Sequence, residues 1–187
     1  MTPKSTWLAL ATLAGFAASN PLPFTNTEPM FIGTLGEGNL ITIHTGFSEP
    51  ANKTSPATAS TALGKRDSFT CPHMGRNPSG DDCSEIYNSI RNVPRHIWAI
   101  PPMGYYEFNY ASCRLRVQNR DTCVTIHAHG SGIAPKVNSM LQCPYYYEAS
   151  ALITMDSPPV MLIMTGQSDD LPAYSADDNC SIPEYTF

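Results

Sequence analysis

The first 66 residues of this 187-residue chain contain no cysteine, and all six cysteines follow them. No apolar run approaches the roughly 20 residues needed to cross a bilayer, so we expect no membrane anchor. Basic residues are few, with 11 Lys and Arg against 16 Asp and Glu and a net charge of -5. Because nucleic-acid binding depends on neutralising phosphates with Lys and Arg, we do not expect a nucleic-acid partner.

Several catalytic and metal-binding motifs are also missing. The chain has no Cys-x-x-Cys pair, no Gly-x-Ser-x-Gly motif, no P-loop and no dinucleotide fingerprint. These absences argue against structural zinc, serine hydrolases of that type and nucleotide enzymes. His127 and His129 could hold a metal together with Glu107, but two histidines at this spacing on a strand are more typical of a surface. We therefore expect no metal and no cofactor.

The N-terminus has the features of a secretory signal peptide. Lys4 precedes the apolar run from Trp7 to Ala18, and Ala17 and Ser19 occupy the -3 and -1 positions of a cut before Asn20. The run is too short for a transmembrane helix and ends in small residues. We expect residues 1–19 to be removed and the protein to be secreted and extracellular.

A dibasic pair, Lys65-Arg66, marks the boundary between the two halves of the chain. Processing proteases of the kexin type cut after such pairs in extended segments. Residues 20–66 are rich in Thr, Pro, Ser, Ala and Gly, which predicts a disordered propeptide and a mature domain of residues 67–187. Within the propeptide, residues 40–44 could form a strand that covers the mature domain, although we favour an inert spacer. Asn52 opens the sequon Asn-Lys-Thr and is the candidate glycosylation site.

The mature domain has an even set of cysteines in a short secreted chain, which predicts three disulfides among Cys71, Cys83, Cys113, Cys123, Cys143 and Cys180. The spacing does not choose among the 15 possible connectivities. Residues 67–187 carry 7 basic and 13 acidic side chains, the latter concentrated in a tail from about residue 167. The length suits one domain with one core, and we expect a monomer.

Hydrophobic periodicity predicts the secondary structure of the mature domain. Residues 81–91 place Cys83, Ile86, Tyr87 and Ile90 on one helical face, with Ser79 as the N-cap and Pro94 beyond the end. A second, shorter helix is expected over residues 134–143, ended by Pro144. Strands are expected over residues 96–100, 106–117 with a bulge near Ala111-Ser112, 122–129 after a hairpin turn at 118–121, 148–155 and 159–165. This order predicts an α+β fold, a two-layer sandwich with two helices packed on one face of a mainly antiparallel sheet of about five strands, stapled by disulfides.

The whole pattern resembles that of fungal small cysteine-rich secreted proteins. Its elements are the signal, the propeptide ending at Lys65-Arg66, Cys71, the helix-borne Asp82-Cys83-Ser84-Glu85-Ile86, the strand with Cys113, the helix end with Cys143 and the final apolar hairpin. It looks most like the α/β sandwiches of fungal killer toxins and killer-toxin-like plant-pathogen effectors. The resemblance implies a virulence effector or toxin-like protein that acts by binding a host or competitor target, and it supplies no catalytic residues.

Polar residues on the strands leave an enzymatic alternative open. With the bulge as placed, Glu107, Arg114, Arg116, His127 and His129 project from the sheet face opposite the core. A carboxylate, a guanidinium and an imidazole on one face suit phosphodiester cleavage. The set His96, Glu107, Arg114 and His127, with the peptide Tyr-Tyr-Glu-Phe at 105–108, is similar to that of secreted fungal guanyl ribonucleases. Here the spacings are compressed, the second helix has no counterpart in that family, and the charge is acidic.

A third possibility is a carbohydrate-binding module that recognises a cell-wall polysaccharide. Tyr145-Tyr146-Tyr147, with Tyr105, Tyr106 and Trp98, could form an aromatic binding platform, although core packing would account for at least half of these rings. From the sequence we expect a secreted, non-enzymatic effector or toxin-like protein whose partner is a host protein or a cell-wall carbohydrate.

Overall fold

The structure is a computed structural model that describes residues 30–35, 38, 40–48, 67–167, 171, 176 and 185–187. The expected signal peptide, the Lys65-Arg66 site, Asn52, Cys180 and most of the acidic tail lie outside the described residues. The domain boundaries inferred from them therefore stay predictions.

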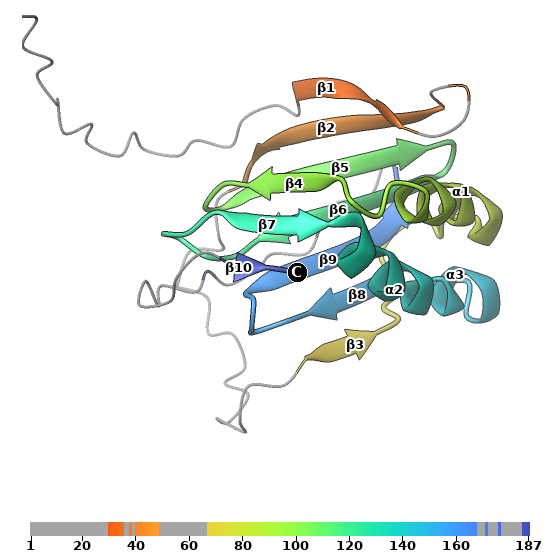
Figure 1. Cartoon of the computed structure of the whole chain (residues 1–187). Helices are drawn as coiled ribbons and strands as arrows, with labels where there is room; N and C mark the ends of the chain where they lie inside the picture. The colour runs from red at the N-terminus through yellow and green to blue at the C-terminus, as the bar shows by residue number, and fades with distance from the viewer. Residues whose placement is uncertain are drawn as a thin grey trace, which may run out of the picture.

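In the part of the chain that the structure describes, ten strands form two sheets (Figure 1). Neighbours in the larger sheet are all antiparallel, in the order β1 (Met30–Leu35), β2 (Ile41–Phe47), β5 (Gly104–Tyr110), β6 (Cys113–Asn119), β9 (Val160–Gly166), β8 (Ala151–Thr154) and β3 (Ser68–Thr70). The smaller sheet has the order β10 (Tyr185–Thr186), β7 (Ile126–His129) and β4 (Ile97–Ile100), in which β10 and β7 run parallel.

The helices α1 (Gly80–Arg91), α2 (Gly130–Met140) and the short α3 (Gln142–Tyr146) lie on the same side of the large sheet as the small sheet (Figure 1). One cluster of buried side chains joins the three helices to the two sheets, and β2 of the large sheet contributes to it. Between the sheets, Trp98 and Phe108 meet edge to face with ring centroids 5.3 Å apart. The α+β class and the mainly antiparallel sheet are confirmed, but the expected count of about five strands was too low.

Helix α1 follows the prediction closely. Its buried face includes Cys83, Ile86 and Ile90, and Ser79 occupies the N-cap position. The Ser79 side chain makes no capping hydrogen bond. Instead the Asp82 carboxylate and the Ser112 hydroxyl meet at the start of the helix, so the helix N-terminus is tied to the turn between β5 and β6.

The second helical region differs from the expected helix over 134–143. Helix α2 begins at Gly130, directly after β7, where a Cβ would lie 2.3 Å from the carbonyl oxygen of Val93. Only glycine permits this close approach. Pro144 does not end the helix but lies in the first turn of α3, where its missing N–H leaves no helical hydrogen bond unmade.

The expected bulge near Ala111-Ser112 is instead a tight hairpin turn. Tyr110 pairs with Cys113 across β5 and β6, and Ala111 adopts a positive φ of 45°. The turn corrects the slip in apolar phase, since Phe108 on β5 and Leu115 on β6 face the core together. With the turn in this place, Glu107, Arg114 and Arg116 still lie on the sheet face opposite the core, as predicted.

The expected hairpin at 118–121 is also wrong, because β6 pairs with β5 and β9 and the following strand, β7, joins the small sheet. Residues 119–121 form a buried polar link between the two sheets. Asn119 Nδ2 donates to the carbonyls of Ile100, Pro101 and Val124 at 3.0, 3.0 and 2.8 Å. Asp121 Oδ1 accepts from the backbone amides of Cys123 and Val124.

The expected disorder of residues 20–66 is wrong for residues 30–35 and 40–48. They form two antiparallel strands, and β2 pairs with β5 from Thr42 opposite Asn109 to Phe47 opposite Gly104. Ile41 and Ile43 are 1% and 7% exposed and belong to the main core. The strand-forming alternative for residues 40–44 is therefore confirmed.

Two disulfides are described in full, Cys71–Cys143 and Cys83–Cys113. Cys123 is also disulfide-bonded, and none of the described cysteines is free. The first bridge ties the segment after β3 to α3, and the second ties α1 to the start of β6. The predicted use of the cysteines as a disulfide framework is confirmed for these residues.

Candidate functional site

The outer face of the large sheet carries an ion pair built from β5 and β6. Glu107 and Arg116 are direct neighbours across the two strands, and Arg116 Nη2 and Nε donate to Glu107 Oε2 at 2.8 and 3.0 Å. Their side chains are only 6% and 12% exposed. Asn109 Nδ2 donates to Glu107 Oε1 at 3.2 Å and lies 3.3 Å from His44 Nδ1 on β2.

Tyr105 completes this cluster. The guanidinium carbon of Arg116 lies 3.7 Å from the centre of the Tyr105 ring, a cation–π contact. Burial raises the pKa of the Tyr105 phenol, and the nearby Glu107 carboxylate raises it further against the opposing effect of Arg116 and Arg114. The phenol is therefore neutral at physiological pH, and the cluster is arranged as a structural ion pair rather than an open acid–base site.

The structure does not bring the histidines of the proposed catalytic set to this cluster. Trp98 and Ala128 of the small sheet face the core, so His127, which alternates with Ala128, points outward from that sheet. Glu107 alternates with the buried Phe108 and points outward from the large sheet. His127 and Glu107 therefore point to opposite sides of the core, and the exposed His96 lies beside Trp98 on the small-sheet side. Of the set, Glu107 and Arg114 share a face, while His96 and His127 lie elsewhere.

A second candidate site is the tyrosine surface, which we define as Phe69, Tyr145, Tyr146 and Tyr147. These side chains are 40%, 47%, 81% and 59% exposed. The other aromatic residues considered for a platform are mainly internal, since Trp98 and Tyr105 are buried and Tyr106 is partly buried. Several exposed aromatic rings, two of which line one pocket, are typical of a binding surface on a small protein.

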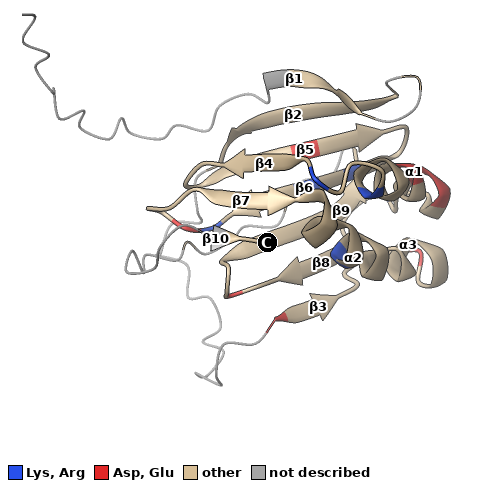
Figure 2. Cartoon of the chain, viewed as in Figure 1, with Lys and Arg blue, Asp and Glu red and all other residues tan. Residues whose placement is uncertain are grey.

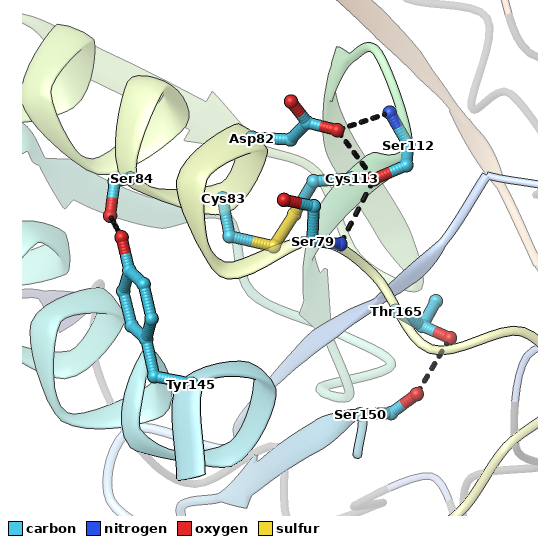
Figure 3. Close-up of a disulfide and its surroundings, with 9 residues drawn as sticks. All are labelled: Ser79, Asp82, Cys83, Ser84, Ser112, Cys113, Tyr145, Ser150 and Thr165. Atoms are coloured by element: carbon cyan, nitrogen blue, oxygen red, sulfur yellow. Dashed lines mark hydrogen bonds between the residues drawn. A yellow bond between two sulfur atoms is a disulfide. The ribbon is translucent and has the colours of Figure 1, made fainter. Parts of the chain in front are cut away.

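Tyr145 fixes α3 against α1 (Figure 3). Its hydroxyl lies 2.8 Å from Ser84 Oγ and donates to Asp81 Oδ1 at 3.1 Å. The ring packs over Gly80, where a Cβ would lie 2.6 Å from a ring carbon. Tyr145 thus connects α3 to α1, whereas Tyr146 and Tyr147 are exposed to solvent.

The end of α3 holds the two outer tyrosines in place. The backbone amides of Tyr147 and Ala149 both donate to the carbonyl of Cys143, and Glu148 between them has a φ of 47°. This geometry resembles the left-handed caps that end many helices. Since Cys143 is bridged to Cys71, the tyrosine surface is stapled to the segment that follows β3.

An open pocket of about 320 Å³ lies between α3 and the edge strand β3. Its lining combines two aromatic rings with polar groups, namely Phe69, Thr70, Cys71, His73, Gln142 and Tyr147. The sequence pointed to the three tyrosines but not to Phe69, His73 or Gln142. The Cys71–Cys143 bridge and the pairing of β3 with β8 bring these residues together, and sequence spacing determines neither of them.

Charge does not single out another site. Lys, Arg, Asp and Glu are scattered over the described chain rather than gathered on one face (Figure 2). In the same residues there is no group of three or more side chains suited to a metal ion. No helix of the described chain is long and apolar enough to span a membrane.

No protein-family model matches the chain, and no curated protein matches it significantly.

Proposed function

We propose that this chain is a secreted binding protein of the effector or toxin-like class and that it engages its target through the tyrosine surface. The observation that carries the proposal is the outward display of Tyr146 and Tyr147 on a helix held by a disulfide and by Tyr145. Tyrosine contributes a large rigid contact area at a low cost in side-chain entropy. Fixing the rings before binding lowers that cost further.

A protein on the surface of a host or competitor cell is the first candidate target. A cell-wall carbohydrate is the second, and the pocket favours it specifically. There, the hydrogen-bonding residues Thr70, His73 and Gln142 line the same pocket as the rings of Phe69 and Tyr147. This combination suits a sugar, which has an apolar face and a rim of hydroxyl groups.

The positions of the histidines do not favour the ribonuclease-like alternative. It requires imidazole, carboxylate and guanidinium groups to converge on one phosphate. The outward directions of His127 and Glu107 on opposite sides of the core do not support such a site.

Removing the two outer rings should abolish most binding. We expect the Tyr146→Ser/Tyr147→Ser variant of the fluorescently labelled protein to bind intact plant or yeast cells at least about tenfold more weakly than the parent, because truncating a central aromatic contact costs about 2 kcal/mol. Ile97→Ser is the matched control, since Ile97 is apolar and 48% exposed on β4. The measurement is the cell-bound fluorescence as a function of protein concentration.

Treatment of the cells distinguishes the two targets. Loss of binding after protease treatment indicates a protein target, whereas loss after chitinase or glucanase treatment indicates a polysaccharide. Pull-down on chitin, cellulose and glucan then identifies the polysaccharide. Equal binding by the parent and the double variant, or equal weakening by Ile97→Ser, would show that the tyrosine surface is not the binding site.

A further inference from the structure

The predicted cut at Lys65-Arg66 divides the chain between two strands that are not neighbours. Strand β2 pairs with β1 and β5, whereas β3 pairs with β8 at the far edge of the large sheet (Figure 1). Cutting between them breaks one peptide bond but none of the described strand pairs. Loss of the upstream segment would require β2 to separate from β5 as a second step.

Strand β2 is held to β5 along six consecutive residue pairs. The pairing continues beyond the strand, where the amide of Ser48 donates to the carbonyl of Met103 and Ser48 Oγ donates to Gln118 Oε1 at 2.8 Å. Thr45 Oγ1 also donates to the carbonyl of Tyr105 at 2.8 Å. Main-chain pairing of this kind is how separate peptides bind to sheet edges in other proteins.

Both faces of β2 are packed as well. On the inner face, Ile41 and Ile43 fill the same core cluster as Phe108. On the outer face, the Tyr105 ring lies against Gly46, where a Cβ would be 2.5 Å from the phenol oxygen. Arg116 stacks on that same ring and pairs with Glu107. The upstream strand is thus integrated into the core and into the outer polar cluster.

From these contacts we propose that the segment containing β1 and β2 stays bound after cleavage at Lys65-Arg66. The mature protein is then a noncovalent complex of two chains rather than residues 67–187 alone. The segment behaves as a β-strand ligand of the β5 edge, with Ile41 and Ile43 as its apolar anchors and Gly46 as the position that accepts the Tyr105 ring. Release would leave β5 as an unpaired edge and expose Phe108, which is fully buried in the precursor.

The test uses the secreted precursor, cut with a kexin-type protease and passed through a size-exclusion column under native conditions. We expect mass spectrometry to find a peptide ending at Arg66 in the same peak as a chain starting at Asp67, and we expect guanidinium to separate the two. A peptide that leaves the domain on cleavage, while the domain stays folded by circular dichroism, overturns the proposal. A precursor that the protease does not cut after Arg66 overturns it too.

Variants identify the contacts responsible. Ile43→Asp places a charge in the core and should lower the retained fraction of the peptide at least about tenfold. Gly46→Val should act similarly by displacing the Tyr105 ring. Leu40→Asp is the matched control, because Leu40 is 60% exposed beside the same strand, and it should retain the peptide like the parent. Equal retention by Ile43→Asp and Leu40→Asp contradicts the assigned anchors.

A measurement on the parent protein covers the case in which a core variant fails to fold. Hydrogen exchange of the amides in Gly104–Tyr110 should remain as slow after cleavage as before it, since β5 keeps its partner. Fast exchange confined to β5 in the cut protein would mean that β2 has left the sheet.

Discussion

Replacing Asn119 with alanine is expected to lower the free energy of unfolding by about 3 to 4 kcal/mol. The side chain is fully buried, and its amide group donates to three backbone carbonyls in a buried or partly buried environment. Its Oδ1 also accepts from the amide of Asp121 at 2.8 Å. Alanine leaves these groups unsatisfied at the point where the large and small sheets meet.

Urea denaturation followed by circular dichroism gives the size of the effect, and thermal unfolding should show a midpoint lower by roughly 10 °C. Asn88→Ala is the control, because Asn88 is exposed on α1 and its loss should change stability by less than about 0.5 kcal/mol. Asn119→Asp keeps the size but removes both N–H donors, so it should destabilise at least as much as alanine. A mild effect of the aspartate would show that shape, not hydrogen bonding, is what the site requires.

The same residues show where the sequence was informative and where it was not. Helix α1 and the hairpin of β8 and β9 were predictable, because local periodicity and nearby turn residues determine them. Asn119 and Asp121 suggested a hairpin turn, since these residue types are common in turns. In the fold they satisfy buried backbone groups of distant segments, and no local pattern indicates that use.

The strand at residues 40–44 was considered but not favoured, and the strand at 30–35 was not expected, for a related reason. The composition of residues 20–66 predicts disorder on average, but residues 41–47 form a strand between β1 and β5 in which Ile41 and Ile43 are buried. Their partner, β5, begins at Gly104, and pairing across such a separation cannot be obtained from single-sequence patterns. The three tyrosines of the tyrosine surface could be predicted, because they are adjacent in the sequence. Phe69 could not, because it comes close to them only through the fold and the Cys71–Cys143 bridge.

Replacing Glu107 with glutamine is the second change for which we expect a large effect, a loss of about 3 kcal/mol in the free energy of unfolding. The substitution keeps the shape of the side chain but removes the charge that neutralises Arg116, whose side chain is only 12% exposed. Removing one partner of a buried ion pair leaves the other charge uncompensated, which costs more than the pair itself contributes. Contact with the Tyr105 ring offsets part of this cost.

A double-mutant cycle separates this effect from general damage. Arg116→Met in the Glu107→Gln background removes the uncompensated charge of Arg116, so the double variant should be more stable than Glu107→Gln alone. Additive losses from the two substitutions would contradict a coupled pair. Glu148→Gln is the control, since Glu148 is an exposed carboxylate outside the cluster, and it should leave the unfolding curve almost unchanged.

The same variant distinguishes a structural carboxylate from a catalytic one. If Glu107 were the base of a ribonuclease, the parent would cleave RNA, and both Glu107→Gln and His127→Ala would lose cleavage at temperatures where they remain folded. We expect no cleavage by the parent and a stability loss confined to Glu107→Gln, because the carboxylate is held by Arg116 and Asn109 and His127 points away on the other sheet. Cleavage that disappears in both folded variants would overturn the binding function proposed for the chain.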